Sequence, residues 1–336
     1  MKMLREVKIG VTLGDPAGIG YEISVKALLK VKKSARGVKF LLFGSEAQLS
    51  KVVKLLQLDD SVLIDGNDVV LVDVGGGPVE FGKVSEEAGR ISYSSFAKAV
   101  DMALRGDIDA IVTAPINKEA WKLAGVKYID HTSALKELTG VKEVMTVFEV
   151  GKLRINFLTK HVSLAEAVRL IKKDLVIEGI RSSLRALRLL GVKNGSIAVA
   201  ALNPHAGEGG LLGDEEIKEI KPAIDEFRRV YNYDKVYGPI PADSVFYLAS
   251  QGLYDIVLSL YHDQGHIAAK TCGFKETVSL NLGAPFLRTS VDHGTAFDIA
   301  GKGLADETNM VKAIERAIAY AKTYRENYAE EYKNFH

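Results

Sequence analysis

The sequence is poor in cysteine, with Cys272 alone among 336 residues, so no internal disulfide can form. Such scarcity is typical of proteins from a reducing compartment. Apolar runs long enough to cross a membrane are also missing. The N-terminal segment has charges within its apolar stretch and lacks the small-residue cleavage site of a signal peptide. We therefore expect a cytoplasmic protein without a membrane partner.

An excess of charge of either sign is missing as well. The chain has 44 Lys and Arg against 43 Asp and Glu, which argues against nucleic acid as an electrostatic partner. Hydrophobic residues make up 47% of the sequence, enough to form the core of one large or two ordinary domains.

Short apolar runs alternate with longer amphipathic segments along the chain. The expected strands are 8–13, 38–44, 69–74, 110–115, 144–150, 153–159, 196–202, 255–261 and 277–283, and the expected helices include 23–32, 85–104, 164–173, 175–190 and 308–328. This alternation predicts an α/β fold with mostly parallel sheets covered by helices. Turn-rich stretches near residues 130 and 283 suggest two α/β/α domains, 1–130 plus 284–336 and 131–283.

The chain has seven histidines, and five of them lie among glycines, prolines and acidic residues rather than in apolar runs. Polar clusters follow several expected strands, and ligands of parallel sheets collect at the carboxyl ends of strands. His161, His205 and His262 each follow a different strand, so they could form a three-nitrogen set for a metal ion with an open position. Each could instead make only local hydrogen bonds.

Three further clusters allow two interpretations each. GDPAGIG at 14–20 could approach an anion through its backbone, or form a plain turn in which Pro16 starts a helix. His131 and Thr132 could bind an anion, or Thr132 or Ser133 could cap a helix. The set of Lys270, Asn281 and Arg288 suits a phosphate plus a carboxylate, or its cations could be solvated.

The motifs GDPAGIG, APINKEA, DHTSALKELTG, TKHVSL, LNPHAGEGGLLGDEE, GPIPADSVF, YHDQGHIAAK and LGAPFLRTSVDHGTAFDIAG resemble the 4-hydroxythreonine-4-phosphate dehydrogenase family of vitamin B6 biosynthesis, from about Gly10 to Met310. The resemblance implies an enzyme that oxidises and decarboxylates 4-hydroxythreonine 4-phosphate with NAD or NADP. It also implies a fold like isocitrate and isopropylmalate dehydrogenases, an active site in the interdomain cleft, and a homodimer with shared sites.

The same resemblance assigns roles to individual residues. His161, His205 and His262 correspond to ligands of one divalent metal per site, such as Zn, Mg or Co. The substrate-binding positions are His131, Thr132, Lys270, Asn281 and Arg288. Asp263, Asp292 and Lys270 are the catalytic candidates; either aspartate could act as the base or orient a metal ligand. Cofactor-contacting residues are not indicated, because the dinucleotide fingerprint is missing.

One departure from the family pattern concerns the substrate. The B6 enzymes usually carry Leu-Pro after YHDQG, whereas His266 and Ile267 stand here. This variant resembles a sister group that acts on D-threonate or D-erythronate 4-phosphate, so we expect His266 either to face the C2 substituent or to touch only protein. Two other classes stay open: a non-catalytic binding protein, and a metal-dependent phosphatase or aldolase without nicotinamide.

Overall fold

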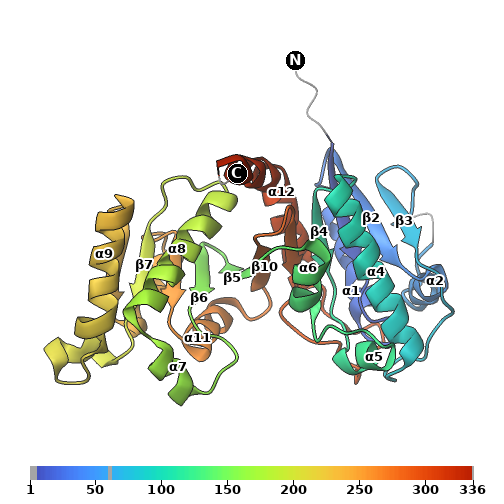
Figure 1. Ribbon diagram of the computed structural model, residues 1–336. Coiled ribbons are helices and arrows are strands. Elements are labelled where there is room, and N and C mark those ends of the chain that lie inside the picture. The colour runs from blue at the N-terminus through green and yellow to red at the C-terminus, as the bar shows by residue number, and fades with distance from the viewer. Residues whose placement is uncertain (1–5, 60–62, 335–336) are drawn as a thin grey trace. The chain divides into compact units, whose positions relative to one another are not determined.

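The computed structural model describes residues 6–59 and 63–334 (Figure 1). The first five residues of the N-terminal segment interpreted above lie outside this range. The chain divides into two compact units, Met1–Val144 with Val278–His336, and Met145–Thr277. Within the described ranges, no helix has both the length and the apolar character that a membrane crossing requires.

Among its described residues, the first unit contributes six sheet strands. Five of them run parallel in the order β3-β2-β1-β4-β11, and the sixth, β10, is antiparallel to β11. Their bounds are β1 (Val7–Thr12), β2 (Val38–Gly44), β3 (Val69–Asp73), β4 (Ala110–Thr113), β10 (Val278–Leu282) and β11 (Leu287–Ser290). β4 and β11 are buried along their whole length, as expected of strands covered on both faces.

Helices cover both faces of this sheet. α4 (Glu86–Arg105), α5 (Lys118–Leu123) and α6 (His131–Thr139) pack on one face around Phe96 and Trp121. α12 (Thr308–Asn334) packs on the other face, where Thr289 Oγ1 donates to the carbonyl of Ala313 at 2.8 Å, and α1 (Gly20–Val31) packs on α12.

The second unit has a five-stranded sheet in the order β5-β6-β9-β7-β8. β5 (Met145–Val150) and β6 (Leu153–Phe157) form an antiparallel hairpin. β6, β9 (Ile256–Ser259), β7 (Ile197–Ala200) and β8 (Val236–Ile240) run parallel. Two helices cover each face: α8 (Lys173–Leu189) and α9 (Lys221–Tyr231) on one, α10 (Ala242–Ser250) and α11 (His262–Gly273) on the other.

The predicted α/β class is confirmed, and all nine expected strands are present. Two observed strands were not expected. β8 contains Gly238 and Pro239, which argue against a strand unless it lies at a sheet edge, as β8 does. β11 has only four residues, three of them polar, and its burial comes from the tertiary structure rather than from an apolar pattern.

The expected breaks after residue 130 and before residue 284 differ from the observed ones. α6 belongs to the first unit because Ala134 and Leu135 pack in the core formed by α4 and α5. β10 belongs there too because it pairs with β11. The short connection between β10 and β11 can join only antiparallel strands. The segment GAPFLRTS comes after the expected strand 277–283, so it would be expected at the carboxyl end of a parallel strand. Instead it follows β10, which runs antiparallel to β11.

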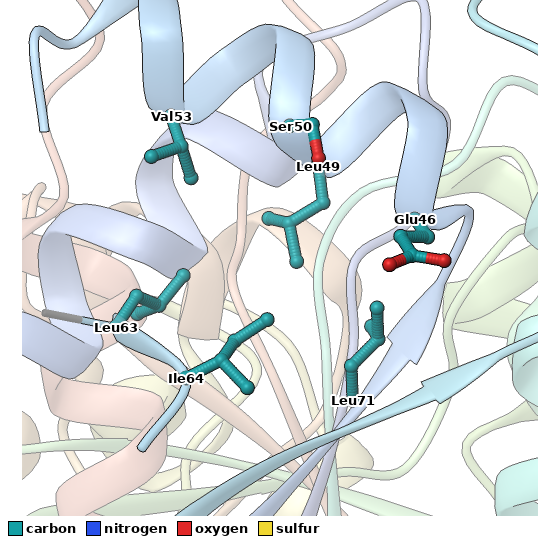
Figure 2. A pocket seen from close by; sticks show the side chains of 7 residues that line it. All are labelled: Glu46, Leu49, Ser50, Val53, Leu63, Ile64 and Leu71. Atoms are coloured by element: carbon teal, nitrogen blue, oxygen red, sulfur yellow. The ribbon is translucent and has the colours of Figure 1, made fainter. Parts of the chain in front are cut away.

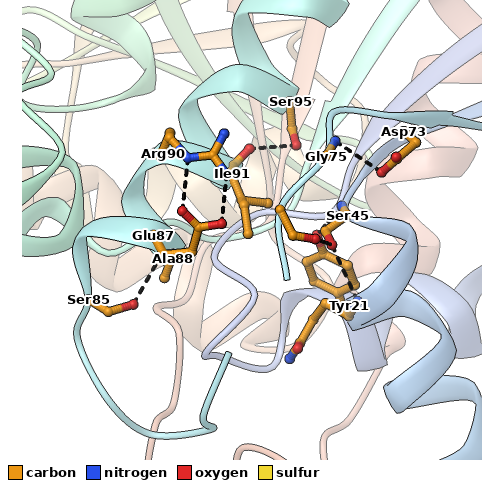
Figure 3. Close-up of polar contacts among 12 residues, drawn as sticks. Tyr21, Ser45, Asp73, Gly75, Ser85, Glu87, Ala88, Arg90, Ile91 and Ser95 are labelled. Carbon is orange, nitrogen blue, oxygen red and sulfur yellow. Dashed lines mark hydrogen bonds and ion pairs between the residues drawn. The ribbon is translucent and has the colours of Figure 1, made fainter. Parts of the chain in front are cut away.

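Two local features of the first unit lie away from the predicted site residues. Tyr21 Oη accepts a hydrogen bond from the Ser45 amide at 2.8 Å, which ties α1 to the start of α2 (Glu46–Leu55) (Figure 3). A hollow of about 250 Å³ lies beside α2 (Figure 2). Its described lining residues include none of the predicted site residues: Glu46, Leu49, Ser50, Val53, Leu63, Ile64 and Leu71.

Candidate active site

The three histidines proposed as metal ligands follow three neighbouring parallel strands of the second unit. His161 comes after β6, His262 after β9 and His205 after β7, and these strands are adjacent in the order β6-β9-β7. The carboxyl ends of parallel strands meet at one edge of a sheet. The fold therefore brings the three backbone segments to the same edge.

Two of the three imidazoles are close neighbours. The ring centroids of His161 and His262 lie 5.6 Å apart. Asp263 Oδ1 lies 2.6 Å from His262 Nδ1. A carboxylate only accepts, so this contact favours the tautomer of a neutral ring in which Nδ1 carries the proton and Nε2 has the free lone pair. Within the described ranges, no group of three His, Cys, Asp or Glu side chains is close enough to hold a metal ion.

His205 lies in a backbone segment of unusual conformation. In η1 (Pro204–Gly210), six consecutive residues from His205 to Gly210 have positive φ, and three of them are not glycine. Such conformations cost roughly 1–2 kcal/mol for each ordinary residue and concentrate at functional sites. Glu216 stabilises the two residues just before this segment. Its buried carboxylate accepts hydrogen bonds from the amides of Leu202 and Asn203 at 2.8 and 2.7 Å.

His266 lies one helical turn after His262 on α11, and the two rings stack at 3.8 Å with 15° between their planes. The ring centroid of His266 also lies 4.4 Å from that of Phe148 and 4.9 Å from that of Phe157. His266 therefore lies beside a proposed metal ligand and also packs in an aromatic cluster, so both interpretations of its role stay open. Lys270 lies one turn further on, with its ammonium 4.7 Å from the ring centroid of Phe274.

The loops that follow β1, β4 and β11 meet in the first unit. The amide of Asp15 donates to the carbonyl of Pro115 at 2.9 Å, and the amide of Ile19 donates to the carbonyl of Thr295 at 3.0 Å. α1 begins at Gly20, so Pro16 lies in the turn and does not start the helix. Gly14 has a φ of +72°, and a Cβ there would lie 2.3 Å from the Pro115 carbonyl oxygen, so only glycine fits.

Asp15 was not identified as a site residue from the sequence. Its carboxyl is fully buried; Oδ1 accepts from the Ala17 amide at 2.8 Å, and Oδ2 has no partner. Burial raises the pKa of Asp15 to about 6, although backbone amides oppose the shift. An aspartate directly before proline in a turn gave no signal that its carboxyl would point inward.

Arg288 and Asn281 of the predicted anion-binding set lie together, whereas Lys270 belongs to the other unit. Arg288 Nη1 donates to Asn281 Oδ1, and Arg288 Nε and Nη2 donate to Thr113 Oγ1 at 3.1 and 2.6 Å. Burial lowers the pKa of Arg288 to about 9, and the charge of Asp130 opposes this. Thr113 was not identified from the sequence, since a threonine at a strand end is common.

His131 and Thr132 begin α6, but neither Thr132 nor Ser133 is the cap. Asp130 caps the helix by accepting from the Ser133 amide at 2.8 Å, and the Ser133 hydroxyl closes a capping box. His131 is buried and its Nε2 has no partner. Burial, and next the charge of Arg288, lower the pKa of His131 well below its usual value, so the ring is neutral.

Asp292 and His293 follow β11 in the first unit. The Asp292 amide donates to Asn309 Oδ1 at 2.7 Å, and the His293 side chain is exposed with Nδ1 3.0 Å from the Gly294 carbonyl. The aspartates considered as base thus lie in different units, Asp263 in the second and Asp292 in the first.

Comparison with known proteins identifies the family. The model of the pyridoxal phosphate biosynthetic protein PdxA matches residues 30–317. A protein of Symbiobacterium thermophilum named "Putative D-threonate 4-phosphate dehydrogenase" is 46% identical over 332 residues, covering 94% of this chain and 97% of the relative. One of the same name from Fusobacterium nucleatum is 44% identical over 330 residues, covering 95% and 98%.

Comparison with a solved structure supports the same family. The 4-hydroxythreonine-4-phosphate dehydrogenase of Klebsiella pneumoniae superposes with a TM-score of 0.80 and 37% identity, covering 93% of this chain and 99% of that one. These relatives are all named as dehydrogenases, so the predicted oxidoreductase class is confirmed. The chain belongs to the family of the pyridoxal phosphate biosynthetic protein PdxA.

Proposed function

We propose that the protein is a cytoplasmic, homodimeric dehydrogenase that oxidises and decarboxylates a 4-phosphorylated hydroxy acid, with NAD and a divalent metal ion. The observation that carries this proposal is the environment of Arg288. Arg288 is 4% exposed, and the hydrogen bonds of its guanidinium go to the neutral oxygen atoms of Thr113 and Asn281. A buried cation that lacks a directly bonded anion is costly, which suits a site that receives an anionic ligand.

His131 and Thr132 would complete this anion site at the start of α6. The Nε2 atom of His131 is buried without a partner, and the amides at a helix start favour negative charge. A neutral imidazole beside a guanidinium can donate a hydrogen bond without adding charge repulsion. Lys270 would serve the other charged end of the substrate.

Two neighbouring histidines of the second unit support the proposal of a divalent metal. His161 and His262 are neighbours, and Asp263 holds Nδ1 of His262, the arrangement that metal-binding histidines commonly have. We propose His161, His205 and His262 as the ligands, in sites shared between the subunits of a homodimer. When bound, the ion would act as a Lewis acid that lowers the pKa of the substrate hydroxyl.

The proposed reaction has two steps. Hydride leaves C3 of the substrate for NAD while the hydroxyl proton passes to a base. The resulting β-keto acid then loses its carboxylate as CO₂, and the electron pair left on C2 takes up a proton. Asp263 is engaged with His262, which makes Asp292 the better candidate for the base.

For the substrate we propose D-threonate 4-phosphate, with 4-hydroxythreonine 4-phosphate as the alternative. The relatives named for D-threonate 4-phosphate reach 44–46% identity, against 37% for the solved 4-hydroxythreonine-4-phosphate dehydrogenase. His266, stacked on a proposed metal ligand, could exchange hydrogen bonds with a C2 hydroxyl. An ammonium at C2 would prefer a carboxylate in that place.

The test of substrate choice is kcat/KM for both compounds in the wild type and in His266→Leu. We expect the wild type to prefer D-threonate 4-phosphate, and the ratio to shift at least tenfold toward the amino substrate in the variant. Ile267→Leu, which changes an exposed neighbour, is the matched control. Identical ratios in both proteins would mean that His266 contacts only protein.

Calorimetry tests binding of the cofactor, and an assay of NADH formation tests the need for the metal. We expect NAD to bind the metal-loaded protein, and chelation to abolish NADH formation until Zn, Mg or Co is restored. A protein that binds no NAD, with or without substrate, would instead be a metal-dependent phosphatase or aldolase.

A further inference from the structure

The hydroxyl of Thr113 determines how the guanidinium of Arg288 is aimed. Arg288 pairs with Ile111 across the β4–β11 ladder, but its guanidinium bonds Thr113, two residues further toward the carboxyl end of β4. The side chain therefore runs along the face of the sheet covered by α4–α6, toward the edge where the loops after β1, β4 and β11 meet.

All three hydrogen-bonding positions of the Thr113 hydroxyl are used. It donates to Ser290 Oγ at 3.0 Å, and its oxygen accepts from both Nε and Nη2 of Arg288. Thr113 is fully buried and Ser290 is 8% exposed, so little water competes for these bonds. The hydrogen bond to Ser290 thus orients the Thr113 hydroxyl so that its oxygen accepts from Arg288. This in turn holds the Nε–Nη2 edge of the guanidinium in place.

Asn281 accepts from the third nitrogen, Nη1. A guanidinium has five N–H groups, and these contacts use three of them. The remaining two are left for a ligand. A planar fork held at one edge can present its other N–H groups to a phosphate or carboxylate in a single orientation.

We propose that Thr113 is a positioning residue of the anion site: it holds Arg288 in the orientation that binds the charged end of the substrate, and Ser290 holds Thr113. This inference rests on the proposed function, because it takes Arg288 to be an anion-binding residue. Thr113 itself need not touch the substrate.

The experiment measures binding of D-threonate 4-phosphate and of inorganic phosphate by calorimetry without NAD, so turnover plays no part. Thr113→Val keeps the shape and removes the hydroxyl; we expect the affinity for the phosphorylated acid to fall about 10- to 100-fold. Thr113→Ser restores the hydroxyl and should stay within about threefold of the wild type. In turnover assays the loss in Thr113→Val should fall mainly on KM.

Arg288→Gln separates this inference from the proposed function. If Arg288→Gln weakens binding and Thr113→Val does not, the positioning role is wrong and the anion site stands. If Arg288→Gln leaves binding unchanged, or the wild type binds neither anion, both are wrong. Should Thr113→Val fail to fold, Ser290→Ala decides: a fall of about two- to fivefold supports the role, and unchanged affinity contradicts it.

Discussion

At the scale of single residues, buried polar side chains hold the proposed ligand-binding groups in place: Thr113 bonds the guanidinium of Arg288, and Glu216 bonds the backbone just before His205. The histidines, Arg288 and Asn281 could be proposed from the sequence because their chemistry is unusual after a strand. Thr113, Glu216 and Asp15 could not, because threonine, glutamate and aspartate are common in loops and at strand ends. Their importance comes from burial and from partners distant in sequence, which only the tertiary structure supplies.

Asp15 predicts a pH-dependent stability. Its pKa in the folded protein, about 6, lies above the ordinary value of 3.8, so the folded state binds this proton more tightly. The stabilisation is complete below pH 3.8 and is lost as the pH rises through about 6. Asp15→Asn cannot ionise and keeps the acceptor for Ala17, so it should be more stable than the wild type at pH 8, by up to about 3 kcal/mol.

Urea unfolding at pH 4 and pH 8 measures this effect. The two proteins should have similar free energies of unfolding at pH 4 and differ at pH 8. Asp68→Asn, which alters an exposed carboxylate, should show no such change between the two pH values. A difference between Asp15→Asn and the wild type that stays the same at both pH values would refute the account.

His205→Asn tests the metal site. Asparagine tolerates the left-handed backbone of this position, where φ is +51°, better than alanine does, so folding should survive. Removal of one of three protein ligands should lower the affinity for Zn or Co at least tenfold. Metal content after dialysis against a chelator, with the melting temperature as the folding control, gives the answer. Unchanged metal content would contradict the assignment.

At the scale of elements, strands with apolar residues on both faces were predictable, and so were the long amphipathic helices. Two strands were not predicted, because their residues are ones that strands normally disfavour. β8 contains Gly-Pro, and β11 is mostly polar. Tertiary pairing overrides local preference in both.

The crossing of α4 and α5 gives a prediction at this scale. A Cβ on Gly89 would lie 1.9 Å from the carbonyl oxygen of Ala120, a backbone atom that cannot rotate away. Gly89→Ala should therefore destabilise the protein by about 2 kcal/mol or more, despite the better helix propensity of alanine. Gly77→Ala, where a Cβ meets nothing within 4 Å, should change stability by less than about 0.5 kcal/mol. Equal free energies of unfolding for the two variants would contradict this prediction, because α5 would then be able to move away from α4 at little cost.

At the scale of the whole molecule, the α/β class followed from strand–helix alternation, whereas the unit boundaries did not. The sequence marks turns, but turns at residues 130 and 283 lie inside the first unit because α6 and β10 pack there. Which turns separate compact units depends on contacts between distant segments. Those contacts leave no local pattern.

The proposed shared sites predict complementation between two inactive chains. If His262 of one subunit serves the same site as Arg288 of the other, a His262→Ala chain and an Arg288→Ala chain form heterodimers with one intact site. A random mixture should then regain about a quarter of wild-type activity, given a two-fold symmetric dimer. Refolding the two together and confirming heterodimers by native mass spectrometry provides the test. No activity in confirmed heterodimers would place each site within one chain.

The most direct test of the central claim measures NADH and CO₂ in one reaction. The metal-loaded protein receives NAD and, in turn, D-threonate 4-phosphate, D-erythronate 4-phosphate and 4-hydroxythreonine 4-phosphate. The account predicts that NADH and CO₂ appear in equal amounts, fastest with D-threonate 4-phosphate, and that both vanish after chelation. NADH without CO₂, or neither product from any of the three compounds, would contradict it.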